Sequence, residues 1–245
     1  MQGATPAEQS RFLRARQHDP AAAALMWKAH ATWREQNLPL PPSAKALGRG
    51  LPMMARFLPS TIRCKDGNRV LVLMGAMYDD AVGGPDDYTR AFAALIDEHV
   101  DRDSDEKFTV CVDARGGDGW RNPGAWSVLP WVRSLASVLS SNFPERLHRL
   151  ILFPVPWIAT AAWGAATALL DEVTSSKMVM VAGNASRDQP IPEAISEHLD
   201  APAVDAIGAF RKACYGLAMG PEPPEADATA PAAAAAPPSA AVEVA

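Results

Sequence analysis

From residue 69 onwards, short apolar runs alternate with helical stretches, and no other feature of the sequence constrains the fold as strongly. Four runs predict buried strands, at residues 70–77, 108–113, 150–153 and 178–181. The stretches between them predict helices, at residues 86–100, 122–142 and 157–170. Strands that are separated by helices usually pair in parallel through right-handed crossovers. The sequence therefore predicts an α/β fold with a mostly parallel sheet flanked by helices.

Two helical segments precede this region. Asp19 followed by Pro20 is typical of an N-cap and a first helical position, and apolar residues then recur at helical spacing to about Gln36. Residues 11–16 resemble the end of an earlier helix whose beginning the chain lacks. Because prolines and glycines then mark a linker, we expect a short helical module over residues 1–50 and a main domain over residues 51–219.

The last 26 residues, 220–245, have a different composition. They hold 11 Ala, 6 Pro, four acidic residues and no basic one. Such a segment buries too little apolar surface to offset the entropy lost on ordering, so we expect a disordered tail. Without its four acids the net charge of −5 becomes −1. This near-neutral charge does not indicate a nucleic-acid partner.

Charge is distributed unevenly along the chain. Residues 1–63 carry nine Lys or Arg and three Asp or Glu, a local charge of +6, whereas residues 64–219 carry 14 and 21, a local charge of −7. A basic segment is attracted to anionic lipid surfaces. We therefore expect residues 1–63 to dock on an anionic membrane surface.

Several kinds of site and segment are disfavoured. The three cysteines are widely separated, which argues against a disulfide framework or a zinc site, and we expect neither a metal nor a cofactor. No P-loop and no Gly-x-Ser-x-Gly motif is present. Residues 150–170 carry no charge, but Pro154 and Pro156 interrupt them, and the remainder is too short to span a bilayer. The chain also lacks the apolar part of a signal peptide, so we expect a cytoplasmic protein.

A few single residues admit a chemical interpretation. Cys111 lies in a predicted buried strand, where a small apolar role is usual. His148 is a candidate general base, although the sequence places no nucleophile beside it. Trp126 and Trp131 are expected in the core. An α/β hydrolase-like enzyme that uses His148 remains an alternative of another class.

Motifs in two parts of the chain, with a shorter match at Val112-Asp113, together resemble the CRAL-TRIO lipid-binding family. The N-terminal part contains Phe12-Leu13-Arg14-Ala15-Arg16 with Asp19 and Trp33-Arg34. The later part contains Phe143-Pro144-Glu145-Arg146-Leu147, Pro154-Val155-Pro156-Trp157, Leu170-Asp171 and Thr174-Ser175-Ser176-Lys177-Met178. The resemblance covers roughly residues 11–200. It implies a sheet and helices that enclose a hydrophobic lipid cavity.

The resemblance also implies a ligand and a site. In the phosphatidylinositol transfer branch of this family, four positions are associated with the phosphoinositide headgroup, and here they are Arg16, Glu145, Thr174 and Lys177. The resemblance implies a monomer that carries one phospholipid, phosphatidylinositol, between membranes or presents it there, without catalysis. A lysine can pair with a phosphodiester, and threonine and glutamate can hydrogen-bond inositol hydroxyls. A sterol, tocopherol or retinoid remains an alternative ligand.

Two further features bear on such a ligand. The apolar helix over residues 157–170 is similar to the gate of the family, and its gate residues are expected to be Trp157, Trp163, Leu169 and Leu170. Phe108 and Val110 stand at strand positions where relatives that bind phosphatidylcholine have hydroxyl side chains. We therefore expect phosphatidylcholine to bind poorly.

Overall fold

The computed structural model describes residues 1–40, 54–117, 123–156 and 172–215. Its centre is a five-stranded sheet in the order β1-β2-β3-β4-β5. The strands are β1 (Ala55–Phe57), β2 (Arg69–Met74), β3 (Phe108–Asp113), β4 (Leu147–Val155) and β5 (Met178–Ala182). The β1 strand is antiparallel to β2, and the other neighbours are parallel. The predicted α/β class with a mostly parallel sheet is confirmed.

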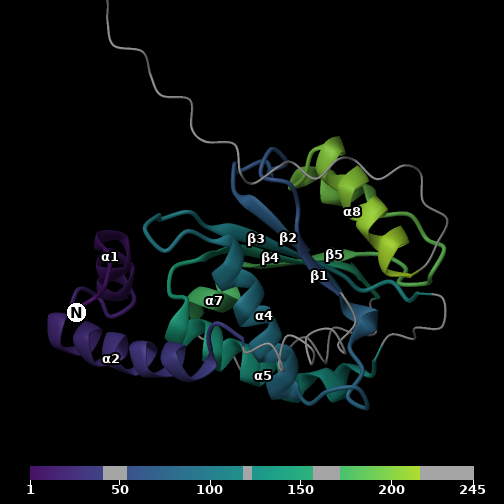
Figure 1. Cartoon of the computed structure of the whole chain (residues 1–245). Helices are drawn as coiled ribbons and strands as arrows, with labels where there is room; N and C mark the ends of the chain where they lie inside the picture. The colour runs from purple at the N-terminus through teal and green to yellow at the C-terminus, as the bar shows by residue number, and fades with distance from the viewer. Residues whose placement is uncertain (41–53, 118–122, 157–171, 216–245) are drawn as a thin grey trace, which may run out of the picture.

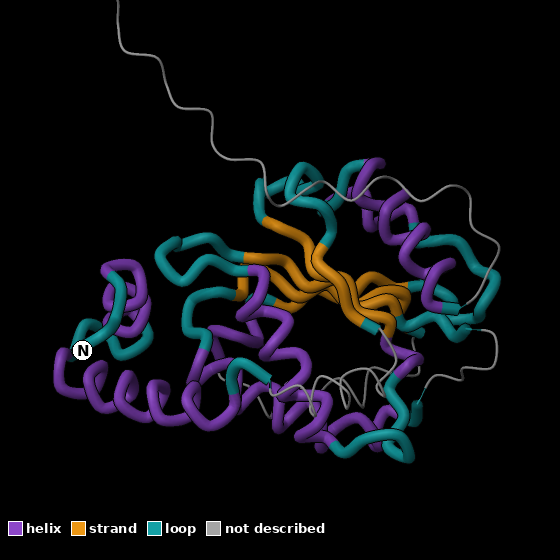
Figure 2. Tube along the Cα trace, viewed as in Figure 1, coloured by secondary structure: helices purple, strands orange, loops and turns teal. Residues whose placement is uncertain are grey.

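Helices cover both faces of the sheet (Figures 1 and 2). On one side lie α4 (Pro85–His99) and α5 (Ala125–Asn142), and on the other lies α8 (Ala201–Cys214). The short elements are the helix α7 (Glu172–Ser176) and the 3-10 helices η1 (Gly75–Met77) and η3 (Glu193–Glu197). Because both faces are covered, β2 is apolar at almost every position, and Val70, Leu71 and Val72 are fully buried.

The N-terminal helices form a separate pair beside the sheet domain, at the lower left in Figure 1. They are α1 (Pro6–Arg14) and α2 (Pro20–Asn37), and they share a small core of Phe12, Met26 and Trp27. The Asp19 side chain accepts hydrogen bonds from two N–H groups of the first turn of α2, which confirms the predicted cap.

Some expectations about elements and burial were wrong or incomplete. The first helix has its beginning within the chain, because Thr5 and Glu8 form a capping box at its N-terminus. Trp131 is buried as expected, but Trp126, in the first turn of α5, is 67% exposed and does not belong to the core. The β4 strand is longer than predicted, and β1 and α8 were not predicted.

Parts of the sequence analysis fall on residues outside those that the structure describes. They include the gate residues and the tail. The division at residues 50 and 219 stays a prediction. No helix among the described residues is both long and apolar enough to cross a membrane.

A buried charged cluster fastens α8 to the carboxyl end of β3. The Asp113 carboxylate accepts from Arg115 at 3.0 and 2.6 Å, and Arg211 of α8 lies 3.8 Å from the same carboxylate. Arg211 also donates to the carbonyls of Arg115 and Arg187, at 3.2 and 2.9 Å. All three side chains of the cluster are at most 6% exposed. The cluster therefore joins β3, α8 and the loop after β5.

Candidate functional site

The amino ends of the three parallel strands β3, β4 and β5 bring together side chains that are far apart in the sequence. Lys107 precedes β3, Glu145 lies two residues before β4, and Lys177 precedes β5. Phe108 is level with Leu147, and Leu150 with Met178. All three residues precede parallel strands at the same end of the sheet, but Lys177 lies beside Arg149, four residues further along the chain than Glu145. We call Lys107, Glu145 and Lys177 the amino-edge site.

Glu145 stands at a tight turn between α5 and β4. Its φ is +63°, a left-handed conformation that is uncommon for a residue with a side chain. Its carboxylate oxygen Oε2 lies 4.0 Å from Nζ of Lys107, and both side chains are partly exposed. The turn therefore presents a carboxylate to solvent beside an ammonium group.

Arg146, the next residue, points inward instead. It is 4% exposed, and its guanidinium donates to the carbonyls of Ser104 and Glu106 at 2.9 and 2.8 Å. Burial, and after it the positive charge of Arg11, lower the pKa of Arg146 to about 10. Arg146 thus holds the loop over residues 101–106, which leads into Lys107 and β3.

The same loop is held from the other side by the N-terminal helices. Arg11 of α1 is buried and donates to the carbonyls of Arg102 and Ser104. Glu8 of α1 accepts from Nε of Arg102 at 2.7 Å. Burial alone would raise the pKa of Glu8, but hydrogen bonds from Arg102 and from the Thr5 N–H bring it below its ordinary value. The loop is therefore fixed between α1 and Arg146.

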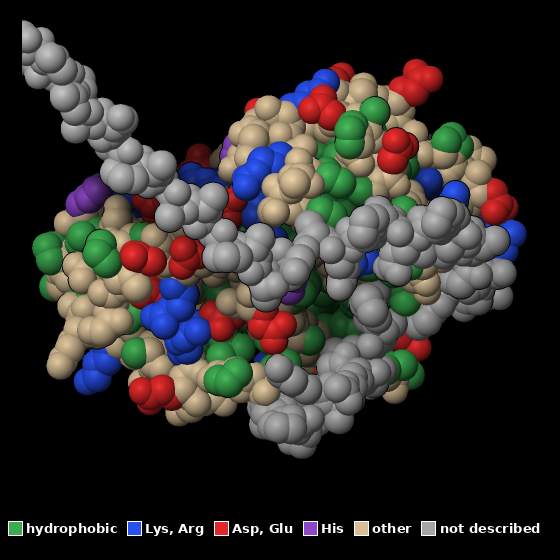
Figure 3. Space-filling model, turned by 45° about the horizontal axis from the view of Figure 1, so that its top comes forward, with side chains coloured by type: hydrophobic (Ala, Val, Ile, Leu, Met, Phe, Trp, Pro, Cys, Tyr) green, Lys and Arg blue, Asp and Glu red, His purple; other side chains and the backbone are tan. Residues whose placement is uncertain are grey.

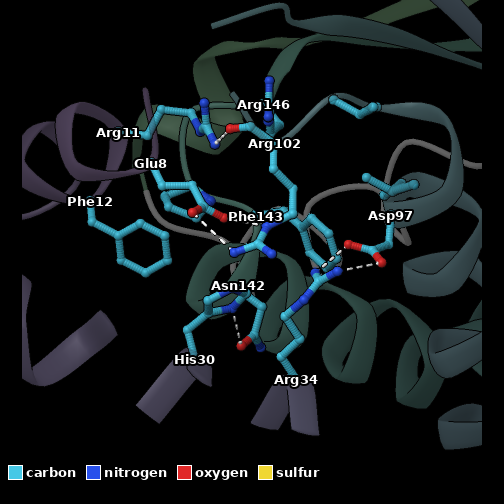
Figure 4. Close-up of a pocket in the computed structure, with 13 residues that line it drawn as sticks. Glu8, Arg11, Phe12, His30, Arg34, Asp97, Arg102, Asn142, Phe143 and Arg146 are labelled. Carbon is cyan, nitrogen blue, oxygen red and sulfur yellow. Dashed lines mark hydrogen bonds and ion pairs between the residues drawn. The ribbon is translucent and has the colours of Figure 1, made fainter. Parts of the chain in front are cut away.

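A polar pocket lies where the N-terminal helices meet the sheet domain (Figure 4). Its floor includes His30 of α2, whose Nδ1 lies 3.2 Å from Oδ1 of Asn142 in α5. At its right side in the figure, Arg34 pairs with Asp97 of α4. His30 is 4% exposed, and burial lowers its pKa. Hydrogen bonds and ion pairs between residues that line the pocket join the N-terminal helices to the sheet domain.

The four residues that the resemblance assigned to the headgroup differ in how the structure places them. Glu145 and Lys177 share the amino edge, and the Lys177 carbonyl accepts the Leu150 N–H at 3.0 Å. Arg16 is exposed just after α1, where its guanidinium donates to the Ala15 carbonyl at 2.9 Å. Thr174 is in α7, but its side chain lies outside the described part.

Lys107 was missed by the sequence analysis. The signal that could have identified it is its position directly before a predicted parallel strand, a position that Lys177 also has.

Part of the positive charge of residues 1–63 is paired within the molecule. Arg14 bonds Asp105 at 2.9 Å, Arg34 bonds Asp97, and Arg63 bonds Glu106 at 2.9 Å. On the face seen in Figure 3, basic and acidic side chains are intermingled and form no single basic patch. The pairs of Arg14 and Arg34 therefore help to dock the N-terminal helices on the sheet domain.

The other chemical candidates find ordinary surroundings. His148 Nε2 lies 2.9 Å from Asp66 Oδ2, and within the described residues no hydroxyl or thiol is hydrogen-bonded to this histidine. Cys111 is fully buried, as expected, and burial raises the pKa of its thiol. The described residues include no group of three His, Cys, Asp or Glu side chains that could hold a metal ion.

Comparisons with known proteins agree with the α/β fold. Thirty-seven chains of solved structures match, among them the crystal structure of Sfh5, with a TM-score of 0.55 and 12% sequence identity. The match covers 71% of this chain and 63% of the Sfh5 chain, so this chain spans less than two thirds of that relative. A search of curated proteins finds no match.

A profile of the CRAL/TRIO domain matches residues 63–202, more than half of the chain. This range contains β2 to β5 and the three residues of the amino-edge site. The chain therefore belongs to the CRAL/TRIO domain family.

Proposed function

We propose that this protein binds one phospholipid, phosphatidylinositol, and transfers it between membranes or presents it at a membrane surface. The observation that carries the proposal is that Glu145 and Lys177 precede neighbouring parallel strands at the same end of the sheet, and the family resemblance associates both with the phosphoinositide headgroup. We propose further that it acts as a monomer in the cytoplasm.

The chemistry of the amino-edge site suits such a headgroup. An ammonium group such as that of Lys177 pairs with a phosphodiester through charge-assisted hydrogen bonds. An ionised carboxylate such as that of Glu145 accepts hydrogen bonds from ring hydroxyls. Thr174 belongs to α7, three residues before Lys177, so its backbone lies close to the same edge. The proposed headgroup therefore meets a donor for its phosphate and an acceptor for its ring.

The thermodynamic role of the protein would be to make exchange of the lipid nearly free of cost. Taking a diacyl lipid out of a bilayer exposes about 30 methylene groups, at roughly 0.8 kcal/mol each. An apolar cavity offsets most of this cost, so the task of the protein becomes kinetic. No bond is made or broken in this function. The assignment of Trp157, Trp163, Leu169 and Leu170 to a gate for the lipid stays a prediction.

The side chains at two positions of β3 disfavour phosphatidylcholine as a ligand. Phe108 and Val110 are 3% and 5% exposed, and the Phe108 ring packs edge-on against Phe57 with a centroid distance of 5.5 Å. Neither side chain offers a hydroxyl to a choline phosphate. We therefore propose that phosphatidylcholine is a minor ligand.

The hydrolase alternative has no support in the surroundings of His148. Its hydrogen-bond partner is Asp66, and no nucleophile among the described residues is hydrogen-bonded to it.

We propose that contact with an anionic membrane is weak. Arg16 and Lys28 are exposed on the N-terminal helices, whereas Arg11, Arg14 and Arg34 are engaged with the sheet domain. Each exposed cation close to an anionic surface contributes about 1 kcal/mol. We therefore propose a transient, salt-sensitive contact and not firm anchoring.

The proposal is tested by identifying the lipid that the purified protein carries, with organic extraction and mass spectrometry. We expect phosphatidylinositol to dominate. Lys177→Ala should reduce this loading about tenfold, since a charge-assisted hydrogen bond contributes roughly 1.5–3 kcal/mol. Lys212→Ala, at an exposed position of α8, is the control and should load normally. A wild-type protein that carries only sterol would refute the proposed ligand.

A further inference from the structure

The carboxylate of Glu145 presents a problem for the proposed headgroup site. A carboxylate beside a phosphodiester repels it, because both groups are negatively charged at neutral pH. Glu145 can therefore serve an anionic lipid only if a cation next to it compensates its charge. Arg16 is a natural candidate from the sequence, but its guanidinium donates to the Ala15 carbonyl.

The cation beside Glu145 is Lys107. Its Nζ lies 4.0 Å from Oε2 of Glu145, and the side chains are 39% and 26% exposed. Both groups are thus partly solvated and remain accessible to a ligand. Other charges at this edge have different partners: Glu106 pairs with Arg63, and Arg146 points inward to main-chain carbonyls.

Strand order explains why Lys107 stands at this position. β4 lies between β3 and β5, so the residues before β3 and β4 are neighbours at this edge, whereas Lys177 lies further along, beside Arg149. The charges of Lys107, Glu145 and Lys177 add up to +1. With Lys107 neutral this sum would be zero, and the attraction of the three residues for a phosphodiester would be weaker.

The backbone that leads to Lys107 is fixed by hydrogen bonds within the protein. The carbonyls of Ser104 and Glu106 accept hydrogen bonds from the buried Arg146. Arg11 of the N-terminal helices bonds the Ser104 carbonyl as well. A backbone that is already fixed loses less entropy when its side chain binds a ligand.

We propose that Lys107 is a headgroup-binding residue of this site, where its ammonium compensates Glu145 and gives the amino edge the positive charge that an inositol phosphodiester requires. This inference rests on the proposed function. It adds a residue that the resemblance does not assign, and it makes the docked N-terminal helices contribute to lipid binding through the loop over residues 101–106.

The test compares binding of the wild type and three variants to phosphatidylcholine vesicles that contain phosphatidylinositol. Lys107→Gln should weaken uptake of phosphatidylinositol about threefold to tenfold, as expected for one partly exposed charge contact. Lys107→Arg should restore uptake because it keeps the cation. Lys65→Gln is the matched control, since Lys65 also lies 4.0 Å from a carboxylate, that of Asp200, and is similarly exposed.

The readouts separate a role in binding from a role in folding. The midpoint of thermal unfolding should be the same for Lys107→Gln and Lys65→Gln, and only the former should lose phosphatidylinositol. Equal uptake by wild type and Lys107→Gln would overturn this inference and leave the proposed function standing. A wild type that takes up no phosphatidylinositol would overturn both.

Discussion

At the scale of single residues, close packing of Gly117 against Tyr215 fixes the loop after β3. A Cβ atom at Gly117 would lie 2.1 Å from the Tyr215 ring, and this ring is itself held over Arg211. Gly117→Ala should therefore destabilise the protein by about 1–3 kcal/mol, as overpacking does. Gly208→Ala is the control, because that Cβ meets nothing within 4 Å and alanine favours the helix by up to about 1 kcal/mol. Urea unfolding of both variants measures the difference, and equal stabilities would contradict the packing.

His30 makes the stability of the N-terminal helices depend on pH. Its ring packs against both Phe12 and Trp27, with centroid distances of 5.2 Å, and burial lowers its pKa in the folded protein. The unfolded chain therefore takes up a proton more readily, so the contribution of His30 is complete above about pH 6.5 and is lost as the pH falls through its folded pKa. Charged neighbours are Glu8 of α1, Arg34 of α2 and Arg102 of the loop, and the two arginines oppose protonation.

Hydrogen exchange in α1 and α2 should thus accelerate below pH 6.5 once the intrinsic effect of pH on exchange is subtracted. His30→Gln should remove this dependence, whereas His18→Gln, at an exposed position in the turn between the two helices, should keep it. If His30→Gln retained the wild-type pH dependence, another group would be responsible.

The residues of the site could be predicted only in part. Glu145 and Lys177 carry recognisable motifs, and their shared edge follows from parallel pairing. Lys107 belongs to no recognisable motif. Its nearness to Glu145 depends on β3 and β4 being neighbours in the sheet, and this order cannot be read from the sequence. The surroundings of Arg11 and Arg146 were equally hidden, because their partners are main-chain carbonyls of one loop.

At the scale of elements, buried pairs of charges join segments that apolar packing alone would leave less well defined. Asp113 at the end of β3 is fully buried and neutralises Arg115, with Arg211 of α8 nearby. Asp113→Ala should cost about 3–5 kcal/mol, since it leaves buried guanidinium groups without a counter-charge. Asp188→Ala removes an exposed pair with Arg187 and should cost less than about 1 kcal/mol. Chemical denaturation would show similar losses for both if Asp113 were not structural.

The long periodic elements were predictable, and the short or edge elements were not. The strand over residues 108–113 and the helix α4 match their apolar patterns closely. The three residues of β1 are too few to show a period, and this strand owes its place to antiparallel pairing with β2. α8, a 14-residue helix with a proline in its first turn, was also not predicted.

At the scale of the whole molecule, part of the uneven charge of the sequence forms ion pairs between the N-terminal helices and the sheet domain. Arg34 and Arg14 of the N-terminal helices pair with Asp97 and Asp105 of the sheet domain. Long-range attraction to a membrane is correspondingly weaker than the local charge of +6 would indicate. The docked helices instead steady the loop that leads to Lys107, so the two parts of the molecule meet beside the proposed headgroup site.

The measurement that tests the central claim most directly is transfer of labelled phosphatidylinositol from donor to acceptor vesicles. Wild-type protein should accelerate this transfer, and Lys177→Ala should slow it about tenfold while Lys212→Ala does not. Labelled sterol in the same vesicles should move no faster than without protein. Transfer of sterol with no transfer of phosphatidylinositol, or equal phosphatidylinositol transfer by wild type and Lys177→Ala, would contradict the account.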